Sequence, residues 1–205
     1  MATIPTRGIS AFKSKLVGGG ARPNLFEVSV TFPAAVDIGI QGDGTGEFDS
    51  DNFRFLCKAA ALPPSNVSPI DIPFRGRTLK VAGDRSFESW TVTIINDESF
   101  NHRRAFEAWM QNIAQYENHA GMNDPNDYMG QATVYQLGRN ASQQQGPTQG
   151  SGGTANIIAQ YRFVDIFPTS VGQIDLSYET TDIIEDFPVE FQIQYYYPEK
   201  PGTNA

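Results

Sequence analysis

The sequence has 205 residues, 40% of them hydrophobic, and carries a formal net charge of −8 with an isoelectric point near 4.7. This length and apolar content are typical of a folded protein with a substantial core, whereas so acidic a balance disfavours general nucleic-acid binding, which needs clustered Lys and Arg. A single cysteine, Cys57, excludes an intramolecular disulfide and a thiolate metal cluster. The sequence contains no apolar run near the ~20 residues of a membrane span, and residues 1–20 lack the apolar segment of a secretory signal.

Alternating apolar and polar residues predict two strands in the first third of the chain. Residues 26–32 show the two-residue period of a half-buried strand, and Pro33 ends the run. Residues 53–58 repeat the pattern with Phe53, Phe55 and Cys57 on one face. Cys57 is therefore expected to be a small buried hydrophobe in a strand rather than a reactive thiol.

A proline-rich run follows these strands. Residues 62–69 contain three prolines and cannot join a central ladder, because proline donates no backbone hydrogen bond. Residues 70–82 then suggest a long extended arm, with Gly83-Asp84 as its turn signal. The next strand is predicted from Trp90 onward, where apolar residues alternate with threonines.

One helix is predicted between the strands. Its apolar residues follow helical spacing and form one stripe: Phe106, Trp109, Met110, Ile113 and Tyr116. Asn96 or Asp97 is a suitable N-cap, and Gly121 a suitable stop. The stripe is expected to pack in the core rather than to bind a cofactor.

Beyond the helix the strand pattern resumes. Strands are predicted over residues 131–137, 157–167, 173–178 and 189–195. Strands on both sides of a single helix, without a βαβ rhythm, predict an antiparallel sheet structure. Residues 37–51 and 140–153 have loop composition and are expected to be surface insertions in a single domain over residues 1–205.

Charge is unevenly distributed along the chain. Residues 1–22 carry four basic residues and no acid, and residues 52–85 are also mainly basic. From Asp165 to Glu199 the acidic residues are unaccompanied by Lys or Arg. These segments are either a solvated surface or complementary poles of a subunit that binds copies of itself. On the second interpretation, the candidate assembly residues are Lys13, Lys15, Arg22, Arg75, Arg77, Lys80, Asp84 and Arg85.

No motif predicts catalysis. His102 and His119 lie apart without a metal-binding spacing and are expected to be ordinary surface residues of the helix. Residues 18–20, three glycines, lack the lysine of a phosphate-binding loop and are interpreted as a hinge. Four acids at Asp43, Glu47, Asp49 and Asp51 do not match an EF-hand and are interpreted as a solvated loop rather than a calcium site. We therefore expect no catalytic residues, no cofactor and no metal.

An ordered series of segments resembles the major tail tube protein of contractile-tailed bacteriophages. The series comprises ARPNLF (21–26), FLCKAAALP (55–63), VAGDRSF (81–87), WTVT (90–93), NDE (96–98) and FPTSVG (167–172). It extends from about Ala21 to Tyr197, most of the chain. The resemblance is weakest in the loops at 37–51 and 140–153.

The resemblance implies an antiparallel β-sandwich or barrel-like subunit with one flanking helix. It implies hexameric rings, in which the sheets join into one β-barrel, and stacking of the rings into a tube within the virion tail, assembled in the host cytoplasm. The implied partners are further copies of the chain, the tail sheath protein, and baseplate and tail terminator proteins. DNA would pass through without being held tightly, and no membrane is involved.

The last predicted strand offers a candidate lumen face. Glu190, Gln192 and Gln194 alternate with apolar residues that should pack inside the subunit. An acidic or neutral wall would suit a DNA channel, because basic residues would hold the phosphates. The alternative is that this face meets bulk solvent.

Three other functions remain open from the sequence. One alternative is a tube-initiating baseplate protein, and another is the tube of a phage-derived injection system. Neighbouring genes would distinguish both from a major tail tube protein. A β-sandwich binding module for carbohydrate or protein would stay monomeric and bind a ligand. An enzyme is disfavoured, because no catalytic set is visible.

Overall fold

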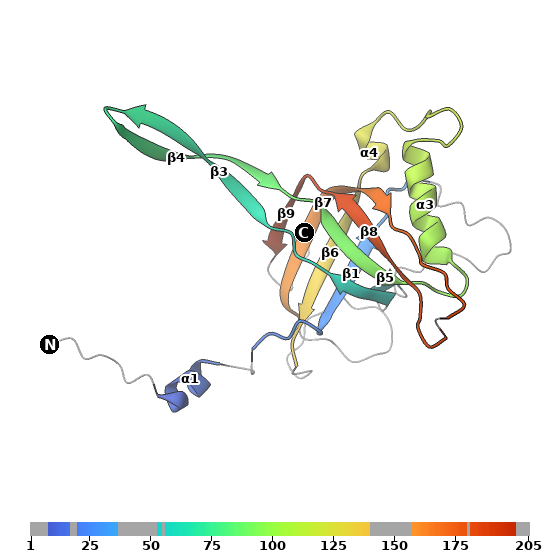
Figure 1. The fold of residues 1–205 in the computed structure, drawn as a ribbon, viewed down its shortest axis with the longest axis horizontal. Coiled ribbons are helices and arrows are strands. Elements are labelled where there is room, and N and C mark those ends of the chain that lie inside the picture. The colour runs from blue at the N-terminus through green and yellow to red at the C-terminus, as the bar shows by residue number, and fades with distance from the viewer. Residues whose placement is uncertain are drawn as a thin grey trace. The chain divides into compact units, whose positions relative to one another are not determined.

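The computed structural model describes residues 8–16, 20–36, 53–54, 56–139, 157–179 and 181–199 (Figure 1). The predicted loops at 37–51 and 140–153 lie outside these residues. The elements are α1 (Ile9–Lys15), β1 (Phe26–Thr31), β2 (Cys57–Ala60), β3 (Ser65–Phe74), β4 (Arg77–Phe87), β5 (Trp90–Ile95), α3 (Asn101–Ile113), α4 (Pro125–Tyr128), β6 (Gly130–Leu137), β7 (Ile157–Val171), β8 (Asp186–Gln192) and β9 (Tyr195–Glu199).

Most strands belong to one sheet. Its order is β1-β6-β7-β8-β5-β2, with β9 paired to β7, and β3 and β4 form a separate two-stranded sheet. The pairs β2–β5, β5–β8, β7–β8 and β3–β4 are antiparallel. The mainly β, antiparallel class predicted from the sequence is thus confirmed. Within the described strands the path ends at β1 and β2, so the subunit alone has an open sheet and not a closed barrel.

The chain divides into two compact units. One contains residues 1–27, 134–161 and 198–205, and therefore α1. The other contains residues 28–133 and 162–197, and therefore the β3–β4 hairpin, α3 and most of the buried side chains. The expectation of a single domain over residues 1–205 stays a prediction.

An aromatic cluster forms the core of the larger unit. Trp90 stacks on Phe163 with ring centroids 4.5 Å apart. The Phe191 ring lies 5.4 Å from that of Trp90, 5.8 Å from that of Phe106 and 6.2 Å from that of Trp109. All five rings are fully buried. Phe106 and Trp109 of the predicted stripe therefore pack against Phe191 on the inner face of β8, as expected of a flanking helix.

The helix is shorter than its predicted bounds. It begins at Asn101, preceded by Phe100 in the left-handed region with φ 57°, and ends at Ile113, well before Gly121. The Asp97 carboxylate still accepts hydrogen bonds from the backbone N–H groups of Asn101 (3.3 Å) and His102 (3.4 Å), so it satisfies first-turn donors without being the N-cap. Tyr116 lies after the helix and is exposed. The short helices α1 and α4 were not predicted.

Three predicted strands differ in the structure. Phe53 and Arg54 are helical, and β2 begins only at Cys57, because Phe53 packs on the rings of His102 and Phe106 at 5.9 Å each. Residues 173–178 form no strand, since alternation without a pairing partner does not make one. The last predicted strand is divided into β8 and β9, with Ile193 and Gln194 between them.

Candidate assembly surfaces

The arm predicted over residues 70–82 is half of a long hairpin. β3 and β4 pair from Ser65↔Phe87 to Phe74↔Arg77. The turn consists of Arg75 and Gly76, both with positive φ (44° and 81°), as a two-residue hairpin turn requires. The prediction of a turn at Gly83-Asp84 is therefore wrong.

Gly83 instead allows a close backbone approach within β4. The pairing register shifts between Val67 and Pro69, directly opposite this segment. A Cβ atom at Gly83 would lie 2.6 Å from the carbonyl oxygen of Ser68, so only glycine fits without a shift. The glycine accommodates an irregular register, and sequence alone does not distinguish this role from a turn.

The hairpin has one apolar face whose side chains remain largely exposed, although the Arg75 guanidinium lies 5.4 Å from the Phe74 ring. Residues directly opposite in an antiparallel pair share a face, and two such pairs are Ile70↔Val81 and Ile72↔Leu79. With Phe74 near the tip they form what we call the apolar hairpin face. Exposed fractions of its side chains are 53% for Ile70, 45% for Ile72, 66% for Phe74, 61% for Leu79 and 42% for Val81.

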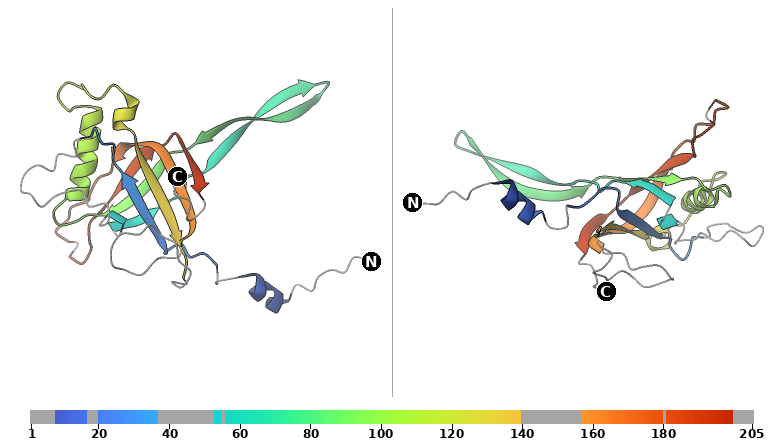
Figure 2. Two further views of the ribbon diagram at one scale, coloured as in Figure 1. Left: turned by 180° about the vertical axis from the view of Figure 1, so that it is seen from behind. Right: turned by 90° about the horizontal axis from the view of Figure 1, so that it is seen from below.

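The opposite hairpin face is polar. It carries Asp71 and Lys80, which form an exposed ion pair at 2.9 Å. Figure 1 and Figure 2 show the hairpin as a ribbon extending from the sheet that contains β5 and β8. So large an exposed apolar strip marks an interaction surface.

The base of the hairpin is attached to the core. The Tyr196 hydroxyl donates to the carbonyl oxygen of Pro63 (2.7 Å), and the Tyr196 ring contacts that of Phe87 at 5.4 Å. The Asn66 amide donates to the Glu88 carboxylate (3.0 Å). These contacts fix the direction of the hairpin without involving its outer part.

The candidate assembly residues fall in both units. Arg75 occupies the hairpin turn, and Arg77, Lys80, Asp84 and Arg85 are exposed on β4. Lys13 and Lys15 lie on α1, and Arg22 lies between α1 and β1; all three are exposed. The sequence interpretation chose the charged residues of the hairpin and missed its apolar face, although the alternation of Ile70, Ile72 and Phe74 was a readable signal.

The candidate lumen residues lie on β8 and just beyond it. Val189, Phe191 and Ile193 are buried, which confirms the predicted inner face of the strand. Gln192 and Gln194 are exposed, and Glu190 is half-buried. Their orientation toward a lumen stays a prediction.

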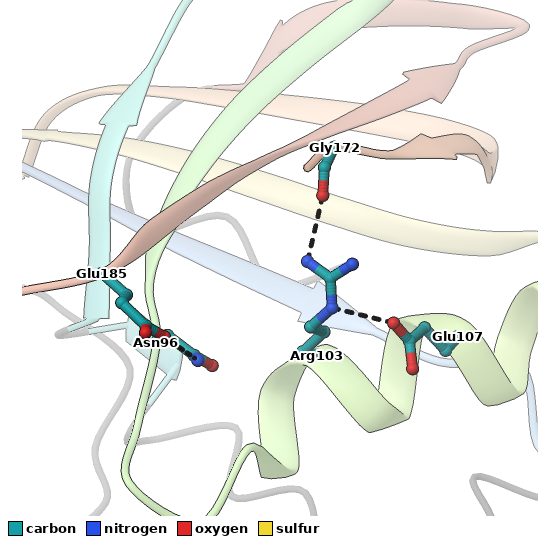
Figure 3. Close-up of polar contacts among 5 residues, drawn as sticks. All are labelled: Asn96, Arg103, Glu107, Gly172 and Glu185. Carbon is teal, nitrogen blue, oxygen red and sulfur yellow. Dashed lines mark hydrogen bonds and ion pairs between the residues drawn. The ribbon is translucent and has the colours of Figure 1, made fainter. Parts of the chain in front are cut away.

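The connection between β7 and β8, residues 172–185, is held at both ends (Figure 3). Arg103 of α3 donates to the Gly172 carbonyl oxygen (3.0 Å) and to the Glu107 carboxylate (2.8 Å). At the other end the Asn96 amide donates to the Glu185 carboxylate (3.1 Å), and the Asn96 backbone N–H donates to the Glu185 carbonyl oxygen (2.9 Å). We call this connection the β7–β8 loop.

The described residues that were considered for catalysis or metal binding do not form a common site. His102 is buried at 3% exposure beside Phe53, and His119 lies beyond α3 with φ 55°, so the prediction of two surface helical histidines is wrong. Among the described residues, no three His, Cys, Asp or Glu side chains are placed to hold a metal ion. The acids at 43–51 and Gly18-Gly19 lie outside the described residues. None of the described helices is long and apolar enough to cross a membrane.

Cys57 is buried at the start of β2, as expected. Burial raises the pKa of its thiol from an ordinary value of 9.0 to about 12. The reactive thiolate is therefore almost absent near pH 8, and access is blocked as well. We predict that a disulfide reagent labels the native protein at pH 8 at least a hundredfold more slowly than the urea-unfolded protein, followed by absorbance. Equal rates would contradict the burial of this thiol.

Comparison with known proteins relates the chain to a protein family. The profile of the phage tail tube protein family matches residues 21–199. The tail tube protein gp19 of Enterobacteria phage T4 is 32% identical over 186 residues, which are 91% of this chain and 94% of that protein. The tail tube protein of Serratia phage KSP90 is 22% identical and covers 85% of this chain and 86% of its own.

Solved structures share the fold. A chain from the sheath–tube complex of the extracellular contractile injection system PVC aligns with a TM-score of 0.53, covering 91% of this chain and 96% of its own at 13% identity. A chain from the anti-feeding prophage baseplate aligns with a TM-score of 0.56, covering 88% and 95% at 9% identity. The profile match and the similarity to gp19 each extend over most of the sequence, and the chain therefore belongs to the phage tail tube protein family.

Proposed function

We propose that this protein builds the inner tube of a contractile phage tail, with hexameric rings that stack and conduct DNA during infection. The observation that carries the proposal is the apolar hairpin face, in a chain that is a family member over residues 21–199. A subunit that functioned alone would leave this strip in water. Lying across a neighbouring copy would remove it from water.

The open sheet supports the proposal of ring closure. Within the described strands, β1 and β2 end the hydrogen-bonded path, and exposed strand edges promote uncontrolled association unless they are paired or covered. A head-to-tail interface that closes into a ring pairs every edge and leaves none free. We propose that the sheets of neighbouring copies join in this way into one β-barrel around the lumen.

The remaining partners are proposed from the family. The related structures are of a sheath–tube complex, a sheath/tube terminator and a baseplate. We extend these to a tail sheath protein, a terminator and a baseplate for this chain, in a virion tail assembled in the host cytoplasm. Catalysis and a cofactor have no part in this function.

Sedimentation velocity over a concentration series tests the proposal. The purified protein should shift from small species to ring-sized and larger species as concentration rises. A compact monomer at every concentration and salt level would contradict the proposal and favour a monomeric binding module instead.

A tube-initiating baseplate protein is the second candidate. The likeness to a chain from the anti-feeding prophage baseplate, at a TM-score of 0.56, is as good as that to the chain from the sheath–tube complex. An initiator should form single rings that do not elongate. The length of the assemblies at high concentration separates the two functions.

The proposed lumen face gives a testable prediction about DNA. If Gln192 and Gln194 line the channel, Gln192→Lys with Gln194→Lys should permit assembly but slow DNA delivery by a phage carrying the variant, because added cations hold phosphates. Wild-type tubes should not retain duplex DNA at low salt. Normal delivery by the assembled double variant would place this face away from the DNA path.

A further inference from the structure

The β7–β8 loop carries an exposed surface that the proposed function has not used. It lines an open groove of about 850 Å³ that includes four large apolar side chains. Their exposed fractions are 80% for Leu176, 106% for Tyr178, 75% for Ile183 and 72% for Ile184. Figure 2 shows this loop, in orange-red, extending beyond the ends of β7 and β8. Side chains this apolar and this exposed indicate a docking surface.

The groove lining contains three acids, Asp175, Glu185 and Asp186, and no Lys or Arg, and Lys58 forms an ion pair with Asp186. Asp175, Glu179 and Asp182 lie on the loop, and no described Lys or Arg forms an ion pair with any of them. Asp175 accepts a hydrogen bond only from its neighbour Gln173 (3.2 Å) among the described side chains. A partner that combines an apolar ridge with positive charge would match this surface.

The helix α1 has those two properties. Ile9 and Phe12 are three residues apart and share one side of the helix, and Leu16 follows as its C-cap. Their exposed fractions are 76%, 65% and 46%. Lys13 and Lys15 provide the charge, and the described residues 8–16 contain no acid. Seven helical residues are too few to be stable in isolation, so a packing partner is needed.

We propose that α1 of one copy docks in the β7–β8 groove of a second copy. The apolar side of the helix packs against Leu176, Ile183 and Ile184. Its lysines face the carboxylate of Asp175 in the groove lining and those of Glu179 and Asp182 on the same loop. The hydrogen bonds of Gly172 and Glu185 to Arg103 and Asn96 hold the ends of the loop before docking (Figure 3).

A second copy is the occupant that the chain itself supplies. Every copy carries one basic apolar helix and one acidic apolar groove, so each contact leaves a helix and a groove free for the next copy. The inference rests on the proposed self-assembly and adds to it a named contact. Docking of α1 in the groove of its own chain is the competing arrangement.

Disulfide trapping between separate chains tests the contact. Protein with Phe12→Cys is mixed with protein carrying Leu176→Cys, and the mixture is assembled and mildly oxidised. Cys57 is buried and is not expected to form a disulfide. We expect a cross-linked dimer on non-reducing gels. Tyr116→Cys, 70% exposed and outside the groove, replaces Leu176→Cys as the control and should give at least tenfold less dimer.

Charge exchange provides an independent test that does not need the cysteine variants. Lys13→Glu with Lys15→Glu should slow assembly at low salt at least tenfold, and adding Asp175→Lys with Glu179→Lys should restore most of the rate. Placing the two lysines at Glu117 and Asp127 instead restores the net charge away from the β7–β8 loop and should not restore the rate.

The outcomes separate this inference from the proposed function. If the wild type assembles but the Phe12→Cys and Leu176→Cys proteins give no cross-linked dimer, or the charge exchange does not restore the assembly rate, the α1 contact is overturned. The proposed tube function is unaffected by that result. A Phe12→Cys, Leu176→Cys double variant that cross-links within one chain, at concentrations where only monomers exist, also overturns the α1 contact. Failure of the wild-type protein to assemble at all overturns the proposed function.

Discussion

Replacing two opposite residues on the apolar hairpin face should abolish assembly and leave the subunit folded. We expect Ile72→Ser with Leu79→Ser to raise the concentration needed for assembly about a hundredfold. The two side chains face each other across the hairpin and are half exposed in the subunit, so burial against a neighbour contributes roughly 3 kcal/mol for the pair. The melting temperature of the monomer should stay within a few degrees of wild type.

The next cross-strand pair provides the control. Asp71→Ser with Lys80→Ser changes neighbouring positions on the opposite hairpin face and removes only an exposed ion pair, worth about 0–1 kcal/mol. This variant should assemble nearly as well as wild type. Replacing residues 69–83 by Asn-Gly, which joins Ser68 to Asp84 through a two-residue turn, should give a folded monomer. Normal assembly of the shortened protein would show that the hairpin is no assembly element.

Phe191→Ala should give the largest loss of stability. The ring is fully buried and lies within about 6 Å of those of Trp90, Phe106 and Trp109, so truncation leaves a cavity between β8 and α3. We expect the free energy of unfolding to fall by about 3–5 kcal/mol in urea titrations. Gln192→Ala, the next residue and exposed, should change it by less than about 0.5 kcal/mol. A loss below about 1 kcal/mol for Phe191→Ala would contradict the packing described.

The strands with a buried face and a paired neighbour were predictable from the sequence. Residues 26–31 and 90–95 alternate because one side of each strand meets the aromatic core. The same pattern at 173–178 predicted a strand wrongly, since Leu176 and Tyr178 are exposed and none of the described strands pairs with this segment. Alternation indicates which side chains share a face, and the pairing partner that makes a strand is not local.

The hairpin shows the same limit for turns and for the candidate site. Gly76 and Gly83 are equally plausible turn residues by composition, and only the register of β3 on β4 distinguishes a turn from a close backbone approach. The charged residues of the hairpin and of α1 were named from the sequence as candidate assembly residues, and their role in assembly stays a prediction. The apolar sides beside them could not be predicted for two reasons. The hairpin face depends on which residues pair across the turn, and α1 is too short for its helical period to be recognised.

Electron microscopy of the purified full-length protein at high concentration tests the central claim most directly. The account predicts hollow tubes of stacked rings, with sixfold symmetry in averaged end views and with β3–β4 of each copy against a neighbouring copy. Particles that remain single subunits in the same images, under conditions in which the protein is folded, would contradict it.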